Sequence, residues 1–168
     1  RLIKRYKRFF ADIQLDNSKE TITAHCPNTG SMQGLLEEGN PVFVTRANDP
    51  KRKLKYTLEI IKSGNANVGV NTHKANRIVE DAIEMHLIPE LGKYNSYKRE
   101  VKYGTNSRID FLLSDDKKQT YVEVKNVTLS RKKETAEFPD AITDRGSKHL
   151  IELSKLPSKN IRAVMLFL

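Results

Sequence analysis

Two acidic residues and one lysine are spaced so that they could hold a metal ion against a phosphodiester. Asp110 lies in the run Ser-Arg-Ile-Asp-Phe-Leu-Leu, and Glu123 and Lys125 follow in the run Tyr-Val-Glu-Val-Lys. Hard divalent ions such as Mg²⁺ bind through one or two carboxylates together with phosphate oxygens and water. Such an ion neutralises developing charge on the phosphoryl group and acidifies a bound water. We therefore predict that Asp110, Glu123 and Lys125 are catalytic, with Lys125 orienting or deprotonating that water.

The same residues define the expected metal ligands. Asp110 and Glu123 are predicted to bind Mg²⁺ or Mn²⁺, and Glu80, on a preceding helix, is predicted to add a third carboxylate. A second interpretation stays open at this point. An acidic residue followed two positions later by lysine is also what the solvated face of an ordinary half-exposed strand presents.

Three strands are predicted to position these side chains, over residues 99–103, 108–113 and 121–128, because β-branched and aromatic residues alternate there between short turns. Residues i and i+2 of a strand share a face, so Glu123 and Lys125 should project together. If the second and third strands pair as a hairpin, Asp110 lies beside Glu123.

One helix is predicted before these three strands and another after them. A helix is predicted from Asn71 or Thr72 to near Pro89, with an apolar stripe that includes Ile78 and Leu87. A second helix is predicted from Phe138-Pro139-Asp140 to about Leu156, followed by a buried strand over 161–168. The resulting order α-β-β-β-α-β, with the acid on the second strand and Glu-x-Lys on the third, is that of restriction-endonuclease-like, PD-(D/E)xK nucleases. Because the chain stops within an apolar strand, we expect this domain, with its mixed sheet, to be truncated at its C-terminus.

The first 66 residues show strand-like alternation without a helical period, at 9–15, 20–26, 41–46 and 56–62. Turn-rich pieces separate these segments, as in a small barrel of the oligonucleotide-binding (OB-fold) kind. Small and polar residues at 63–67 mark the boundary. The sequence thus predicts a two-part α+β or α/β chain, with an OB-fold-like all-β domain over 1–66 and a nuclease-like domain over 67–168.

The composition favours a polyanionic partner. Thirty Lys and Arg stand against 21 Asp and Glu, for a net charge of +9. We expect DNA, most simply double-stranded, with RNA not excluded. Basic side chains are also common on ordinary solvated surfaces, which is the competing interpretation for each of them. The side chains expected to contact phosphates are Arg5, Arg8, Lys51, Arg52, Lys53, Arg108, Arg145 and Lys148.

Several classes of function find no support in the sequence. Cys26 is the single cysteine, and no apolar run approaches 18 residues, so we expect a cytoplasmic protein that does not bind membranes. The segment 28–32 lacks the lysine and paired glycines of nucleotide-binding loops, and is expected to be a tight structural turn. Nothing in the sequence indicates an oligomeric state.

Eight separate motifs also match a known family in the same order along the chain. They are Leu-Ile-Lys-Arg-Tyr-Lys-Arg-Phe at 2–9, His-Cys-Pro-Asn-Thr-Gly-Ser-Met at 25–32, Pro-Lys-Arg-Lys-Leu at 50–54, Val-Gly-Val-Asn-Thr at 68–72, Ser-Arg-Ile-Asp-Phe-Leu-Leu at 107–113, Tyr-Val-Glu-Val-Lys at 121–125, Phe-Pro-Asp-Ala at 138–141 and Asp-Arg-Gly-Ser-Lys-His-Leu at 144–150. With these motifs the sequence resembles the sugar fermentation stimulation protein A family of bacteria and archaea. The resemblance implies an oligonucleotide-binding barrel joined to a nuclease-like domain, DNA binding without marked sequence preference, and a regulatory link to sugar (maltose) use. It also implies a longer chain, and a role for the 28–32 loop that it does not specify.

Three hypotheses follow. The first is a DNA-binding protein with a Mg²⁺- or Mn²⁺-dependent phosphodiesterase site, that is, a nuclease. The second is a non-enzymatic DNA-binding regulator of sugar (maltose) metabolism that uses an inactive nuclease scaffold. The third, an enzyme acting on a small sugar phosphate, has the least support, since the sequence shows neither a nucleophile with a partnering base nor a cofactor loop.

Overall fold

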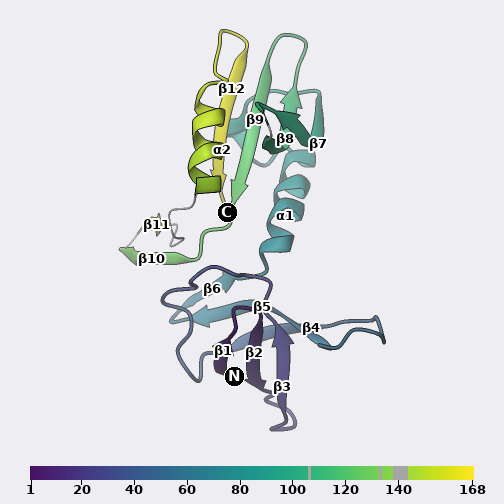
Figure 1. Ribbon diagram of the computed structural model, residues 1–168, viewed down its shortest axis with the longest axis vertical. Helices are drawn as coiled ribbons and strands as arrows, with labels where there is room; N and C mark the ends of the chain where they lie inside the picture. The colour runs from purple at the N-terminus through teal and green to yellow at the C-terminus, as the bar shows by residue number, and fades with distance from the viewer. Residues whose placement is uncertain (106, 133, 138–143) are drawn as a thin grey trace. The chain divides into compact units, whose positions relative to one another are not determined.

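The computed structural model describes residues 1–105, 107–132, 134–137 and 144–168, and these form two compact units (Figure 1). The first unit comprises Arg1–Lys74 with Asn126–Ala141, and the second comprises Ala75–Lys125 with Ile142–Leu168. Each unit is described by itself. None of the helices in the described part of the chain is long and apolar enough to cross a membrane.

The first unit is built on a six-stranded sheet. Its strands are β1 (Leu2–Tyr6), β2 (Phe10–Gln14), β3 (Thr21–His25), β4 (Val42–Arg46), β5 (Tyr56–Ser63) and β6 (Ala66–Gly69). They pair in the order β1-β2-β3-β5-β4, with β3 and β5 parallel, the other pairs antiparallel, and β6 added to β5. This Greek-key order is that of the predicted OB-fold. Two strands, β1 and β6, were not predicted.

One face of this sheet is buried and builds the core of the first unit. Ala11 and Ile13 alternate along β2, whereas Leu58 and Ile61 of β5 lie three positions apart, across a register shift between β4 and β5. All four are essentially inaccessible to solvent. A short hairpin, β10 (Leu129–Lys132) with β11 (Thr135–Glu137), belongs to the same unit.

Glu59, on β5, ties the barrel to the segment that enters the first helix. Its carboxylate accepts hydrogen bonds from Thr45 and Asn71 and pairs with Lys74, whose Nζ lies 3.0 Å from Oε2. Burial on its own would raise the pKa of Glu59, but these three partners together hold it below the ordinary value of 4.5.

A pH dependence of stability follows from this lowered pKa. A carboxylate whose folded-state pKa is depressed stabilises the fold above its unfolded pKa, and loses that contribution as the pH falls through the folded value. We expect Glu59→Gln to destabilise the protein at neutral pH and to differ progressively less from the wild type as the pH falls below 4.5. Urea unfolding of both proteins across this range measures the difference. A gap that stays constant with pH would contradict the prediction.

The second unit is a four-stranded mixed sheet with one helix on each face. Its elements are α1 (Thr72–Glu84, which begins in the first unit), the 3₁₀ turn η1 (Pro89–Leu91), β7 (Ser96–Tyr103), β8 (Ser107–Ser114), β9 (Gln119–Lys125), α2 (Asp144–Ser154) and β12 (Ile161–Phe167). The strand order is β12-β9-β8-β7, with β12 parallel to β9 and the other pairs antiparallel. The predicted α-β-β-β-α-β order of these elements is confirmed.

Strand alternation separates the two faces of this sheet. Val122 and Val124 pack in one core with Val79 and Ile83 of α1. Tyr121 and Met165 pack in the other, with Leu153 of α2. The α1 core and the α2 core therefore lie on opposite sides of β9.

The helix boundaries differ in part from the expected ones. The Asn71 side chain accepts a hydrogen bond from the His73 amide, which is the predicted cap at the start of α1. The helix ends at Glu84, before the expected end near Pro89, and His86 adopts a φ of 53°. Ile78 and Leu87, predicted to face the core, are 51% and 65% exposed. The predicted start of α2 at 138–140 lies outside the described residues.

Candidate active site

Asp110 lies on β8 opposite an unusual backbone conformation in β7. Arg99 pairs with Phe111 and Val101 pairs with Ile109 in the same register, and Glu100 between them adopts a φ of 51°. Phe111 packs in the α1 core and Ile109 in the α2 core, although they are two positions apart. Asp110 therefore lies at the point where β8 changes the face that it presents to each core.

The Asp110 carboxylate is held from two directions. Oδ1 accepts a hydrogen bond from Asn76 Nδ2 of α1 at 2.8 Å, and Oδ2 accepts one from the backbone amide of Val124 at 2.7 Å. Val124 is the residue between Glu123 and Lys125 on β9. The structure therefore fixes Asp110 against the segment that carries the other two predicted catalytic residues.

Glu123 and Lys125 project from the same face of β9, as their spacing predicted. Lys125 Nζ donates to Glu123 Oε1 at 2.7 Å, and His149 Nδ1 of α2 lies 3.8 Å from the same oxygen. The Glu123 side chain is only 7% exposed, whereas that of Lys125 is 33% exposed. The second carboxylate oxygen, Oε2, is buried without a hydrogen-bond partner among the described residues. A buried oxygen of this kind is costly unless a ligand satisfies it.

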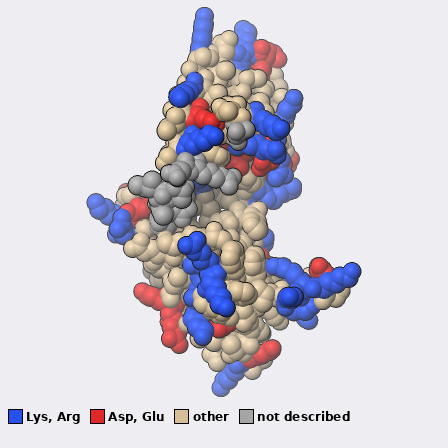
Figure 2. All heavy atoms as spheres, in the orientation of Figure 1, with Lys and Arg blue, Asp and Glu red and all other residues tan. Residues whose placement is uncertain are grey.

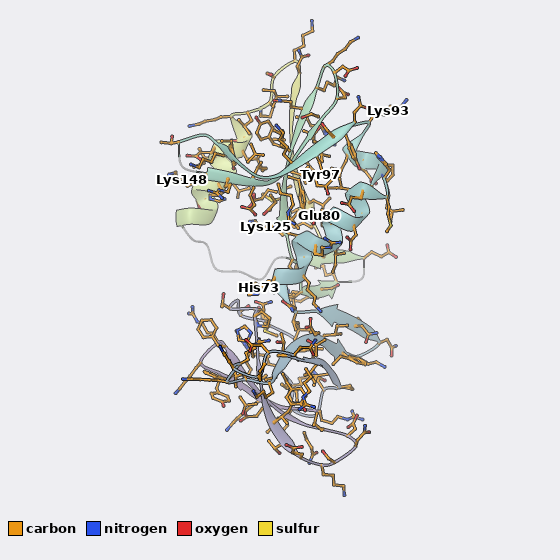
Figure 3. All side chains as sticks on the ribbon, turned by 90° about the vertical axis from the view of Figure 1, so that its right-hand side faces the viewer. His73, Glu80, Lys93, Tyr97, Lys125 and Lys148 are labelled. Carbon is orange, nitrogen blue, oxygen red and sulfur yellow. The ribbon has the colours of Figure 1, made fainter. Side chains whose placement is uncertain are left out.

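Glu80, the expected third carboxylate, is engaged by arginine. Its Oε2 lies 2.9 Å from Arg99 and 3.6 Å from Arg77, and its Oε1 accepts from the Tyr97 hydroxyl at 3.2 Å. Figure 3 shows Glu80 close to Tyr97. A hydrogen bond to Glu84, followed by burial and the charge of Glu80, raises the pKa of Tyr97 to about 12.

The described residues thus bring Asp110 to the Glu123–Lys125 segment, and they give Glu80 a separate set of partners. No group of three or more His, Cys, Asp and Glu side chains in the described part of the chain is arranged to hold a metal ion. A cation at this site would therefore rely on the carboxylates of Asp110 and Glu123, with water and phosphate oxygens completing its shell.

The predicted phosphate contacts of the second unit are only partly described. Arg108 is exposed on β8. Lys148, on α2, is half-exposed, and its Nζ lies 3.8 Å from Glu152 Oε1. The side chain of Arg145 lies outside the described residues.

Basic side chains gather on the β4–β5 hairpin of the first unit. Lys51 and Lys53 are exposed there, and Figure 2 shows Lys and Arg side chains along this hairpin, at the right of the view. Arg52 is half-buried and donates to Thr57 Oγ1 at 3.0 Å. Arg8 is exposed in the β1–β2 turn. In OB-folds, the loops of this barrel end contact oligonucleotides.

Arg5 is turned toward the protein instead. Its Nη2 donates to the backbone carbonyls of Asn28 at 2.8 Å, and of Gly30 and Arg8 at 3.0 Å each. The Asn28 side chain in turn accepts from the Gly30 amide at 2.8 Å, and Met32 is buried at a φ of 50°. Arg5 therefore holds the 28–32 segment, which is a loop with a bend at Gly30, and the turn assigned next to it lies at residues 33–34.

Comparison with known proteins covers the whole chain. Residues 3–70 match the family model described as SfsA N-terminal OB domain, and residues 73–168 match that of the sugar fermentation stimulation protein RE domain. Sugar fermentation stimulation protein homologs of Pelagibacter ubique and Maricaulis maris are 55% and 50% identical over all of this chain and 72% of each relative. The structure of Pyrococcus furiosus SfsA in complex with Ca²⁺ superposes with a TM-score of 0.81 at 28% identity, over 99% of this chain and 69% of that one.

Proposed function

The chain belongs to the sugar fermentation stimulation protein family, and from that premise we propose that it is a DNA-binding protein that cleaves phosphodiesters. DNA is bound largely without sequence preference. Asp110, Glu123 and Lys125 form the catalytic site, and Mg²⁺ or Mn²⁺ is the cofactor.

One observation carries this proposal. The Asp110 carboxylate accepts a hydrogen bond from the backbone amide between Glu123 and Lys125, just beyond the last pair of β8 with β9, and Lys125 binds Glu123. The acids come from neighbouring strands, and the Asp110 carboxylate is held both by α1 and by the backbone of β9. An ordinary solvated strand face requires neither feature.

The residues fit a hard divalent cation. Asp110 and Glu123 offer carboxylate oxygens, the donors that Mg²⁺ and Mn²⁺ prefer, and Oε2 of Glu123 has no hydrogen-bond partner among the described residues. A relative of this chain has been solved with Ca²⁺, which prefers the same donors. When bound, such a cation would supply neutralisation of the scissile phosphate and a more acidic water.

The chain's own residues supply position and charge. Asn76 and the Val124 amide orient the Asp110 carboxylate. Lys125, one-third exposed, keeps its ammonium beside Glu123 and open to solvent, where it can contact a phosphate oxygen or orient a water.

The direct test is cleavage of supercoiled plasmid DNA by the purified chain. We expect nicked circles to accumulate with Mn²⁺ or Mg²⁺, and none to form when the ions are chelated with EDTA. DNA retention without nicking under any divalent ion would overturn the enzymatic proposal and leave the binding one.

The second candidate function is DNA binding without cleavage, in a regulator of sugar (maltose) metabolism. The basic hairpin favours it, since Lys51 and Lys53 are exposed in the unit that contains none of the three catalytic residues. Both candidate functions include DNA binding, and they differ in whether the site cleaves the DNA.

The hairpin carries its own prediction. Replacing both Lys51 and Lys53 by alanine removes two phosphate contacts, so the slope of log affinity against log salt should become shallower by about 2. Fluorescence anisotropy on a labelled duplex at several salt concentrations measures this slope. The control replaces Lys62 and Lys98, two exposed lysines outside the loop that joins β4 to β5, by alanine. Equal slopes for the hairpin variant and the wild type would show that the hairpin does not contact DNA.

A further inference from the structure

We propose that α2 adds a second cation position to this site, held by the carboxylates of Glu123 and Glu152 and by the hydroxyls of Tyr103 and Ser107. The inference rests on the proposed function, since Glu123 would serve both positions. It extends that function by assigning a ligand role to Glu152, on the helix opposite α1.

The first support is a set of buried polar atoms without partners. Oε2 of Glu123, Oε2 of Glu152, the Tyr103 hydroxyl and Ser107 Oγ are all buried and have no hydrogen bond of normal geometry among the described residues. Ser107 and Tyr103 are only 3% and 8% exposed, and the side chains of Glu123 and Glu152 are 7% and 14% exposed. Each such group is costly to bury without a ligand.

The second support is that these groups adjoin one another. Tyr103 and Ser107 face each other at the end of the β7–β8 hairpin. On α2, His149 Nδ1 lies 3.8 Å from Glu123 Oε1, and Glu152 follows His149 by three positions, on the same side of the helix. The two carboxylates therefore adjoin the same stretch of α2.

The Glu152 carboxylate of α2 packs closely against Gly104, in the turn between β7 and β8. The glycine has a φ of 58°, and a Cβ placed on it would lie 2.7 Å from Glu152 Oε2. The hairpin turn thus leaves room for the Glu152 carboxylate only because it carries no side chain there.

Each of the two glutamates has a lysine near its Oε1 atom, and its Oε2 atom is left available for a cation. Lys125 binds Oε1 of Glu123, and Lys148 lies 3.8 Å from Oε1 of Glu152. The two Oε2 atoms and the two hydroxyls remain, and all four are hard oxygen donors of the kind that bind Mn²⁺, Mg²⁺ or Ca²⁺. We expect one cation to take all four oxygens as ligands.

The test counts Mn²⁺ ions bound by the full chain without DNA, by electron paramagnetic resonance of free Mn²⁺ and by calorimetry. The variants are Asp110→Asn and Glu152→Gln, and Glu90→Gln serves as a matched exposed control. We expect two ions for the wild type and the control, and one for each of the site variants. Ser107→Ala, a smaller change, should weaken one of the two ions at least several-fold, so the proposal stays testable if Glu152→Gln does not fold.

The outcomes separate this inference from the proposed function. A single ion that Asp110→Asn removes and that neither Glu152→Gln nor Ser107→Ala affects would overturn the second position and leave the nuclease site intact. A single ion that Glu152→Gln removes and Asp110→Asn leaves would support the second position and contradict the first. No bound ion at all would overturn both, and would mean that water or a shared proton satisfies the buried oxygens.

Discussion

Replacing Asp110 by asparagine, or Lys125 by alanine, is expected to lower the rate of DNA nicking by at least about 100-fold, the scale of losing one charged group that acts on the transition state. Asparagine keeps the shape of Asp110 and one acceptor for the Val124 amide, but it removes the negative charge that would bind the cation. Alanine at 125 removes the ammonium and leaves the buried Glu123 carboxylate without its ion pair. Initial rates on supercoiled plasmid measure both effects.

Two controls accompany these variants. Asp116→Asn and Lys98→Ala remove the same charges from exposed positions of the same unit, and should cleave at the wild-type rate. Both site variants should still retain DNA in a gel-shift assay, because the basic hairpin lies in the other unit. Wild-type nicking in both site variants would exclude Asp110 and Lys125 from catalysis.

Replacing Arg5 by alanine is expected to lower the free energy of unfolding by about 3 kcal/mol, since charged hydrogen bonds contribute roughly 1.5–3 kcal/mol each and their loss leaves carbonyls unpaired. Three backbone carbonyls, those of Arg8, Asn28 and Gly30, lose their donor. Urea unfolding followed by circular dichroism measures the change. Arg46→Ala, an exposed change in the same barrel, should have little effect.

The Arg5 variant also decides between two roles for this residue. We predicted from sequence that Arg5 contacts phosphate, and the structure shows its guanidinium bonded to the protein. Unchanged stability combined with weakened DNA binding would restore the phosphate-contact role. Lost stability, with DNA affinity unchanged in the folded fraction, would assign Arg5 to the 28–32 loop.

The elements with a strong period were predictable from sequence. Strand alternation located β2, β3, β4 and β5, and the shared face of Glu123 and Lys125, because the two-residue period holds over most of each strand. A register shift between β4 and β5 breaks that period locally. Strand β1 was missed because three of its five residues, Lys4, Arg5 and Tyr6, are polar or amphipathic, and this hides the alternation around the buried Leu2.

The rest depends on contacts that no local pattern records. Asn76 is an unremarkable polar residue of α1 in the sequence, and only the packing of that helix shows it holding Asp110. The arginine partners of Glu80 come from β7 and from its own helix, so its spacing alone could not distinguish an ion pair from a metal ligand. Glu152 is a similar case, since its burial depends on the glycine turn between two strands.

The central claim is that Asp110 and Glu123 share a divalent cation beside Lys125. Anomalous diffraction from crystals soaked in Mn²⁺ tests it most directly, because the ion is located without reference to activity. We predict an anomalous peak bound by carboxylate oxygens of both Asp110 and Glu123. A peak that touches neither residue, or no peak at saturating Mn²⁺, would contradict the account.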